Sequence, residues 1–187
     1  MIQAVFLDRD GTLNVKPADH EYVTAVKDFK WLPGAVDGVV ALARAGVRLA
    51  VVSNQRGVAR GLIDPAVLAG IEELIQAELA VHGCRIEAFS YCLHDLDDAC
   101  ECRKPRPGML IRLAQELGLD LTRTWMVGDS ATDVQAGRAA GCRTVQITRG
   151  IPVPGADAGA ASLSEAAALI LQSSDQPAAA KPSTSAS

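Results

Sequence analysis

The sequence of 187 residues predicts a doubly wound, Rossmann-like α/β fold with a parallel sheet. Two patterns lead to this prediction. Short apolar runs rich in β-branched residues alternate with longer helical segments, and prolines and glycines stand at the borders between them. Strands that alternate with helices are joined by right-handed crossovers, which make the sheet parallel and place helices on both of its faces. The length is typical of one domain with a sizeable core.

Five apolar runs are expected to form the strands. They are residues 3–8 (QAVFLD), 46–54 (GVRLAVVSN), 86–92 (IEAFSYC), 124–129 (TWMVGD) and 142–148 (CRTVQIT). Each run is short, and several end in a charged or polar residue, which is typical of strands buried on both faces of a parallel sheet.

Helices are expected between these strands. The helical segments are 34–45, about 65–82, 108–117 and about 132–140, and a weaker one follows at 162–172. Prolines precede or open three of them and glycines follow four, as helix starts and C-caps require. We expect residues 1–172 to form the domain. Residues 173–187 have no aromatic or large aliphatic side chain, so we expect a disordered tail.

Composition narrows the class of protein. The net charge of −4 argues against a nucleic-acid partner, which favours a basic surface. No apolar run is long enough to span a bilayer, and the first residues lack the basic region and cleavage site of a signal peptide. We therefore expect a cytoplasmic protein without a membrane partner. We also expect a monomer. The five cysteines are an odd number, and in a reducing compartment a Cys/His cluster indicates a metal site first.

Polar side chains follow the predicted strands where each strand ends. They are Asp8 and Asp10 after the first strand, Ser53, Asn54 and Gln55 at the second, Arg103 and Lys104 after the third strand and its cysteine loop, and Asp129 at the fourth. Ligands of doubly wound sheets bind outside the carboxyl ends of the strands. The sequence therefore predicts that three carboxylates, a hydroxyl, an amide and a lysine meet at one rim.

This set of residue types fits one reaction, the hydrolysis of a phosphate monoester. A single aspartate after a strand is more often a turn residue or an N-cap. A cluster of carboxylates, however, needs a cation, and Mg²⁺ pairs one or two carboxylates with substrate phosphate and water. One carboxylate can attack phosphorus to form an aspartyl-phosphate, while a second protonates the leaving oxygen. Hydroxyl, amide and lysine donors suit the phosphoryl oxygens.

A second candidate metal site lies in the segment CLHDLDDACEC. Cys92, His94, Cys100 and Cys102 form the pattern C-x-H-x5-C-x-C, with the Cys₃His ligand set of structural zinc. The alternative is a reduced loop without metal, but three exposed thiols are easily oxidised. Four protein ligands leave no open position on the ion, so we expect this Zn²⁺ to be structural rather than catalytic.

Four motifs carry a resemblance to a known family. DRDGT at 8–12, VVSN at 51–54, RKP at 103–105 and VGDSATD at 127–133 resemble the motifs of the haloacid-dehalogenase (HAD) phosphatase superfamily, in that family's order and over about residues 4–147. The resemblance implies the HAD fold, with Asp8 as nucleophile and Asp10 as general acid and base.

The same resemblance implies the magnesium and phosphate ligands. Asp8 and Asp129 would bind Mg²⁺ through their side chains and Asp10 through its backbone carbonyl, while Ser53 and Lys104 would hold the phosphoryl group. Asp133 remains open between a metal contact and an acid favoured at the start of a helix.

The pattern CxH…CxCRKP resembles the zinc-containing branch of the superfamily, which includes phosphatases of heptose 1,7-bisphosphate and of histidinol phosphate. SNQRGVARG at 53–61 and RDGTLNV at 9–15 are similar to the heptose group. The implied substrate is a sugar phosphate, D-glycero-D-manno-heptose 1,7-bisphosphate, which would lose its C7 phosphate on the way to lipopolysaccharide or surface-glycan heptose. The alternatives are histidinol phosphate or another small molecule, and, in a different class, a non-catalytic zinc-clip adaptor. The anomer stays open.

No segment is long enough for a cap domain, so we expect an essentially capless fold whose loops select the substrate. A bisphosphate carries a second dianion, which Arg103, and Arg60 or Arg56, could meet by bidentate pairing. A solvated loop is the alternative for Arg56 and Arg60. The resemblance implies that Asp19, His20 and Tyr22 touch the sugar.

Overall fold

A parallel sheet forms the centre of the computed structural model, which describes residues 1–18 and 21–173 of the chain. Within these residues six strands are hydrogen-bonded in the order β3-β2-β1-β4-β5-β6. They are β1 (Ala4–Leu7), β2 (Arg48–Asn54), β3 (Ala88–Cys92), β4 (Thr124–Gly128), β5 (Arg143–Ile147) and β6 (Ala158–Ala160). Asp19, His20 and residues 174–187 lie outside the described residues, and with them nearly all of the predicted tail.

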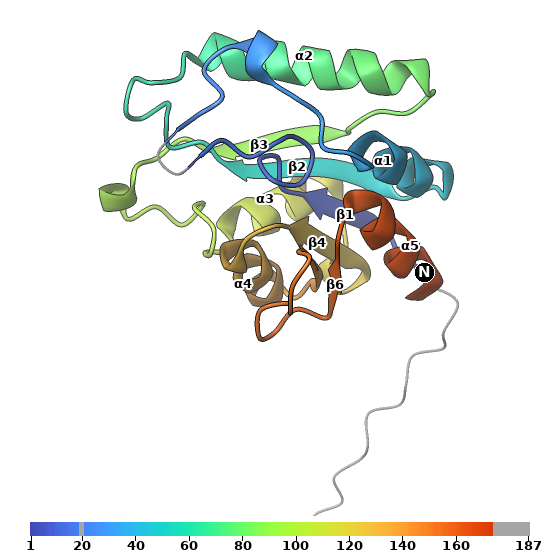
Figure 1. Cartoon of the computed structure of the whole chain (residues 1–187). Helices are drawn as coiled ribbons and strands as arrows, with labels where there is room; N and C mark the ends of the chain where they lie inside the picture. Colours follow the sequence, from blue (N-terminus) through green and yellow to red (C-terminus); the bar gives the residue numbers. More distant parts are fainter. Residues whose placement is uncertain (19–20, 174–187) are drawn as a thin grey trace, which may run out of the picture.

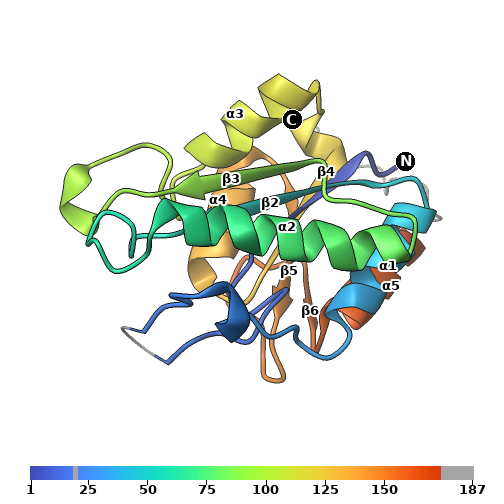
Figure 2. The same ribbon diagram turned by 90° about the horizontal axis from the view of Figure 1, so that it is seen from above.

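Helices cover both faces of the sheet, as the sequence predicts (Figures 1 and 2). They are α1 (Ala35–Arg44), α2 (Pro65–Val81), α3 (Gly108–Leu117), α4 (Ala131–Ala140) and α5 (Leu163–Ser173). Short 3-10 helices lie at Val26–Asp28, Leu96–Asp98 and Leu121–Arg123. Apolar side chains of α1, α2 and α5 pack on one face of the sheet, and those of α3 and α4 pack on the other. The doubly wound α/β prediction is therefore confirmed.

The alternation of side chains along the strands produces two cores. Successive residues of a strand point to opposite faces of the sheet. Val5 and Leu7 accordingly pack with apolar side chains of α1, α2 and α5, whereas Phe6 packs with those of α3 and α4. All three side chains are fully buried. This double burial explains why the strands are continuous apolar runs rather than alternating ones.

The strand order changes direction between β1 and β4. The chain moves from β1 through β2 to β3 on one side and then crosses to β4 on the other. Leu7 is paired in register with Val51 and with Val127, and the Asp8 N–H donates to the Val127 carbonyl at 2.8 Å. The three central strands therefore end at the same level, at the topological switch point where such sheets bind ligands.

The structure trims the predicted strands and adds one. The third strand begins at Ala88 rather than Ile86, because the Ile86 N–H donates to the Gln76 side chain on α2 instead of to a neighbouring strand. The sixth strand, β6, was not predicted, since its sequence Ala-Gly-Ala carries no apolar pattern. It pairs with β5 at the edge of the sheet. Among the described residues, no helix combines the length and apolar character that a bilayer crossing needs.

Candidate active site

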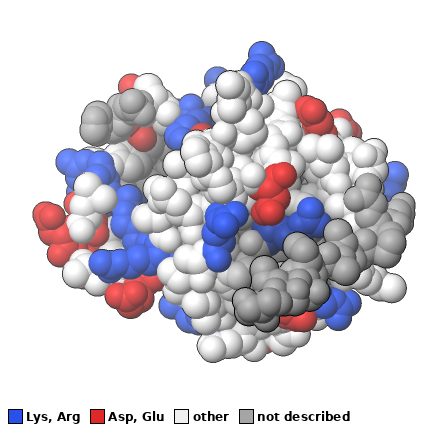
Figure 3. Space-filling view, turned by 90° about the horizontal axis from the view of Figure 1, so that it is seen from below, with Lys and Arg blue, Asp and Glu red and all other residues white. Residues whose placement is uncertain are grey.

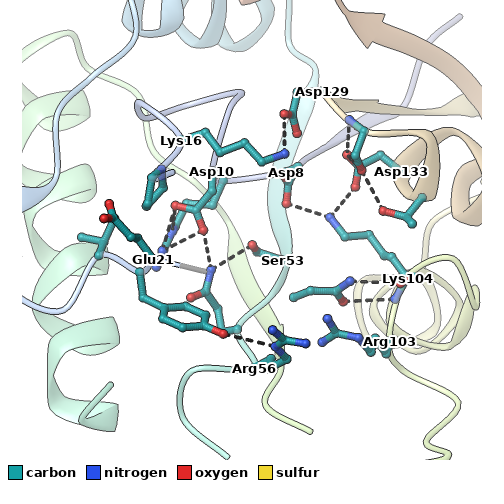
Figure 4. Close-up of a pocket in the computed structure, with 18 of the residues that line it drawn as sticks. Asp8, Asp10, Lys16, Glu21, Ser53, Arg56, Arg103, Lys104, Asp129 and Asp133 are labelled. Carbon is teal, nitrogen blue, oxygen red and sulfur yellow. Dashed lines mark hydrogen bonds and ion pairs between the residues drawn. The ribbon is translucent and has the colours of Figure 1, made fainter. Parts of the chain in front are cut away.

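A cavity of about 360 Å³ opens at the carboxyl ends of β1, β2 and β4 (Figure 4). Its lining includes Asp8, Asp10, Ser53, Lys104 and Asp129, which come from separate parts of the chain. Asn54, Gln55, Arg103 and Tyr22 also line it. The structure thus brings together the residues that the strand ends predicted.

Lys104 makes the central contacts of this cavity. Its ammonium lies 2.7 Å from Asp8 Oδ1 and 2.6 Å from Asp133 Oδ1, and it donates to the Val52 carbonyl at 2.7 Å. Asp8 and Lys104 are 7% and 3% exposed. Burial raises the pKa of Asp8 to about 7, against the lowering effect of Lys104. Burial lowers the pKa of Lys104, but Asp133 and Asp8 outweigh it and hold the pKa above its usual value.

Asp8, Asp129 and Asp133 form an oxygen-rich group that could hold a cation. Each offers a carboxylate oxygen, and these oxygens all lie within 4.8 Å of one another. Burial also raises the pKa of Asp129, although a hydrogen bond from Lys16 opposes this. Lys16 Nζ lies 2.7 Å from Asp129 Oδ2. Two buried carboxylates and a half-buried one at this spacing fit a hard divalent ion such as Mg²⁺, which prefers oxygen ligands.

Asp133 has a second role at the start of α4. Its Oδ2 accepts hydrogen bonds from the Ser130 N–H at 3.0 Å and the Ser130 hydroxyl at 2.7 Å, which completes a capping box. Its other oxygen faces Lys104. Of the two alternatives for Asp133, the structure therefore shows the helix-start acid, and it also places this acid within the carboxylate group.

Two glycines allow the carboxylates to approach the backbone. Gly11 has a φ of +92°, and a Cβ there would lie 2.5 Å from the Asp129 carboxyl carbon. A Cβ on Gly128 would overlap the carboxylate of Asp133. The glycines of the DRDGT and VGD motifs thus leave room for the acidic side chains.

The side chains of Asn54 and Gln55 form hydrogen bonds with other residues of the site. The Asn54 side chain accepts from the Lys104 N–H at 3.1 Å and donates to the Lys104 carbonyl at 3.0 Å. Gln55 Nε2 donates to Asp10 Oδ2 at 2.8 Å and to the Ser53 hydroxyl at 3.1 Å. Both side chains therefore fix the positions of the residues predicted to act on the phosphoryl group.

Asp10 is held by several donors. Arg9, which is fully buried, contacts both of its carboxylate oxygens, and Asn14 donates to one of them at 2.9 Å. Neither Arg9 nor Asn14 was predicted as a site residue, and Lys16 was missed as well. For Arg9 the sequence did contain a usable signal. An arginine between two aspartates directly after a buried strand would itself be buried, and its charge would then need a carboxylate partner.

The four predicted zinc ligands come together beside this cavity. Cys92 Sγ lies 3.7 Å from His94 Nδ1, 3.6 Å from Cys100 Sγ and 3.3 Å from Cys102 Sγ, and His94 Nδ1 lies 3.2 Å from Cys102 Sγ. Ligand atoms arranged tetrahedrally at about 2.3 Å from a zinc ion would be separated by about 3.8 Å. The five cysteines, all within the described residues, are free of disulfides. The donor set and its spacing fit a four-coordinate zinc ion.

The cysteine loop contacts Arg56 and Arg60, which the sequence suggested as ligands of a second phosphate group. Asp95 lies 3.8 Å from Arg56 Nε and 3.9 Å from Arg60 Nε, and Arg56 Nε donates to the Tyr22 hydroxyl at 3.1 Å. Arg103 Nη1 lies 3.4 Å from the His94 carbonyl oxygen. Arg56 lines the cavity, whereas Arg60 is not part of its lining. Three segments distant in the sequence thus meet at one side of the cavity.

Comparisons with known proteins agree with this geometry. A family model described as HAD-hydrolase-like matches residues 101–173. The D-glycero-beta-D-manno-heptose-1,7-bisphosphate 7-phosphatase of Photorhabdus laumondii is 39% identical over 160 residues, which cover 81% of this chain and 84% of that protein. The enzyme of the same name from Pseudomonas aeruginosa is 38% identical, with coverages of 78% and 81%.

This chain belongs to the heptose-bisphosphate 7-phosphatase family of HAD-like hydrolases. A solved structure agrees. The D,D-heptose 1,7-bisphosphate phosphatase from B. bronchiseptica, complexed with magnesium and phosphate, is 32% identical and superposes with a TM-score of 0.83 over 92% of this chain and 99% of that one. The predicted resemblance and HAD fold are therefore confirmed, and this HAD hydrolase is a phosphatase.

Proposed function

We propose that the chain removes the C7 phosphate of D-glycero-D-manno-heptose 1,7-bisphosphate, with Mg²⁺, through an aspartyl-phosphate on Asp8. The observation that carries this proposal is the cavity in which Asp8, Asp10 and Lys104 meet at the switch point of the sheet. A non-catalytic adaptor would need no second carboxylate held beside the first. The location at the strand ends is the one expected for a doubly wound fold.

The chemistry follows from the roles that these side chains can take. Asp8 attacks phosphorus while the bond between phosphorus and the C7 oxygen breaks, and Asp10 gives its proton to that oxygen. Water then attacks the phosphorus of the aspartyl-phosphate, and Asp10 accepts the water proton as the Asp8 carboxylate is released. Lys104 and Ser53 hold the phosphoryl oxygens during both steps.

We propose that Mg²⁺ is held by Asp8, Asp129 and the Asp10 backbone carbonyl, with Asp133 close by. When bound, the ion neutralises carboxylate and phosphate charge. The raised pKa values of Asp8 and Asp129 support a cation site, because buried carboxylates without a divalent partner favour their protonated forms.

We also propose that Cys92, His94, Cys100 and Cys102 hold a structural Zn²⁺. Their mutual spacing supports this, and four protein ligands would leave no position for substrate. The ion would fix the loop that carries Arg103 and Lys104 toward the cavity.

The substrate assignment rests on three supports. The curated relatives bear the heptose 1,7-bisphosphate name at 36–39% identity. The cavity has arginines, Arg56 and Arg103, at a side away from Asp8, where a second phosphate needs cations. The loops around it contain no cap segment in the described residues. Histidinol phosphate, the alternative, carries only one phosphate group and offers no second dianion to these arginines.

A substrate panel tests the proposal. We expect kcat/KM for heptose 1,7-bisphosphate, in whichever anomer is better, to exceed that for histidinol phosphate and fructose 1,6-bisphosphate by at least about tenfold, a difference of about 1.4 kcal/mol in transition-state binding. The Asp8→Asn variant serves as the control for contaminating phosphatases. A preference for histidinol phosphate would overturn the substrate assignment while leaving the phosphatase chemistry intact.

We further infer that the small-molecule substrate is the only partner needed. Figure 3 shows basic and acidic side chains on the same face rather than one continuous basic surface, which supports the absence of a nucleic-acid partner. We propose a monomer as well. Three free thiols in one loop are compatible with the reducing cytoplasm. Light scattering on the assayed sample, and fractionation of cells, check these two points; a dimer or a membrane-bound pool would contradict them.

A further inference from the structure

We propose that Arg9, together with Gln55, orients the general acid Asp10, and that Arg9 is a positioning residue rather than a structural one. This inference rests on the proposed role of Asp10. Arg9 follows β1 directly and none of its surface is exposed. Its Nη2 lies 2.9 Å from each oxygen of Asp10, and its Nε lies 3.2 Å from Oδ1. A planar guanidinium placed in this way fixes the rotation of the carboxylate.

Two buried amides complete the arrangement. Asn14 Nδ2 donates to Asp10 Oδ1 at 2.9 Å, and Gln55 Nε2 donates to Oδ2 at 2.8 Å. Asn14 is fully buried and Gln55 is 2% exposed. Both oxygens of Asp10 are therefore held by donors from three side chains, while 21% of the side chain of Asp10 stays exposed at the cavity.

The backbone between these residues is also fixed. The Arg9 carbonyl accepts from the N–H groups of Leu13 and Asn14 at 2.9 and 3.1 Å, and the Gly11 N–H donates to the Asn14 carbonyl at 2.8 Å. This tight turn brings Asn14 back beside Asp10. The acid is thus preorganised before a substrate enters, which an acid with free rotation would not be.

Gln55 links the acid to the phosphoryl site. The same amide nitrogen that donates to Asp10 also donates to the Ser53 hydroxyl at 3.1 Å. If Ser53 holds a phosphoryl oxygen, this contact sets the position of the acid relative to the phosphorus atom. Proton donation to the leaving oxygen depends on that position.

Arg9 borders the cavity, but only 1% of its side chain is exposed, so it offers a substrate almost no surface. A purely structural role fits poorly as well. The side-chain hydrogen bonds of Arg9 in the described residues all go to Asp10, and Nη1 has no protein partner there. The position of the Arg9 side chain therefore serves its contacts with Asp10, although one of its own nitrogens is left without a protein partner.

Two phosphate esters of similar size test the role. Benzyl phosphate has an alkoxide leaving group that needs a proton, whereas p-nitrophenyl phosphate has one that leaves without it. The kcat/KM value covers the steps up to cleavage of the phosphorus–oxygen bond. We expect Arg9→Lys and Gln55→Met each to lower kcat/KM for benzyl phosphate about tenfold to a hundredfold, and that for p-nitrophenyl phosphate less than about threefold.

Two further variants make the test decisive. Arg48→Lys, which alters an arginine–glutamate pair at the other end of β2, is the matched control and should change neither value. Asp10→Asn should show the same selective loss in a stronger form; if it does not, the acid role in the proposed function fails. Asp10→Asn can show the selective loss while Arg9→Lys and Gln55→Met lower kcat/KM for both esters equally or not at all. That result would overturn the positioning role alone. Should Arg9→Lys not fold, the result for Gln55→Met decides between these outcomes.

Discussion

At the scale of single residues, burial determines the electrostatics of the site. Asp8 is 7% exposed, and burial raises its pKa to about 7; Asp133 and Asp10 raise it further, while Lys104 opposes the shift. Relative to an unfolded-state pKa of about 4, the folded protein without metal favours the protonated acid. The stability that Asp8 contributes is therefore complete below about pH 4 and is lost as the pH rises through about 7.

The raised pKa of Asp8 predicts how magnesium binding depends on pH. The ion needs the ionised carboxylate, so binding below about pH 7 must displace a proton. We expect the affinity for Mg²⁺ to rise by up to about tenfold per pH unit between pH 5 and 7 and to level off above that range. Calorimetric titration in buffers of different ionisation enthalpy measures both the affinity and the protons released. An affinity that is constant from pH 5 to 8 would contradict the raised pKa of Asp8.

The residues that the sequence could predict are those that follow directly from strand ends. Asp8, Ser53 and Asp129 each end or follow an apolar run, and the shared edge of a parallel sheet brings them together. Arg9 had a usable signal in its place between Asp8 and Asp10, but its contacts with Asp10, and the position of Lys16, could not be predicted in this way. Their positions depend on a turn and a loop that double back on the chain, and no periodicity in the sequence encodes such a turn.

At the scale of elements, the cysteine loop is the segment with the least packing of its own. Between β3 and α3 it contains only the 3-10 helix Leu96–Asp98, whose residues are all exposed or half-buried. The loop is held instead by the cluster of Cys92, His94, Cys100 and Cys102, and by the Gly108 N–H, which donates to the Glu101 carbonyl at 3.1 Å. A metal ion in that cluster would replace a hydrophobic core.

Removal of zinc is therefore expected to weaken substrate binding more than chemistry. Asp95 and Arg103 belong to the loop and would lose their positions, and Arg56 would lose its contact with Asp95. Lys104 remains tied to Asn54 by two hydrogen bonds. For Cys100→Ser we expect a rise in KM of about tenfold, a smaller fall in kcat and a melting temperature lower by several degrees.

The control for this variant is Cys84→Ser, because Cys84 lies outside the cluster and its thiol only donates to the Leu79 carbonyl. Metal analysis should find about one zinc per chain in the control and less in Cys100→Ser. A zinc-free sample with unchanged KM and melting temperature would contradict the proposal of a structural zinc ion.

The sequence predicted the strands whose burial produces a long apolar run, and it missed the strand that has no such run. The β1 and β2 runs are almost fully buried, and their positions were predicted within two residues. The three residues of β6 are small and only Ala160 is buried, and the strand is placed by contacts such as the Thr144 N–H donating to Asp157 at 2.7 Å. Contacts of this kind between distant residues are not visible in a local sequence window.

At the scale of the whole molecule, the site depends on the doubly wound topology. The change of direction between β1 and β4 coincides with the cavity at the carboxyl edge of the sheet. The described residues form no additional domain over this edge (Figure 2). Tyr22, Arg56 and Arg103 line this cavity, and we propose that the loops that carry them select the substrate. The sequence predicted this capless plan from segment lengths, but it could not predict that Asp95 joins two of these loops.

The central claim is that Asp8 forms a covalent phosphoenzyme. The most direct measurement is rapid acid quenching of a single turnover with phosphorus-labelled heptose 1,7-bisphosphate, followed by identification of the labelled peptide. We predict transient label on the peptide that contains Asp8, released by hydroxylamine as an acyl phosphate is, and no label in the Asp8→Asn variant. Full turnover without bound label, or label on another residue, would contradict the account.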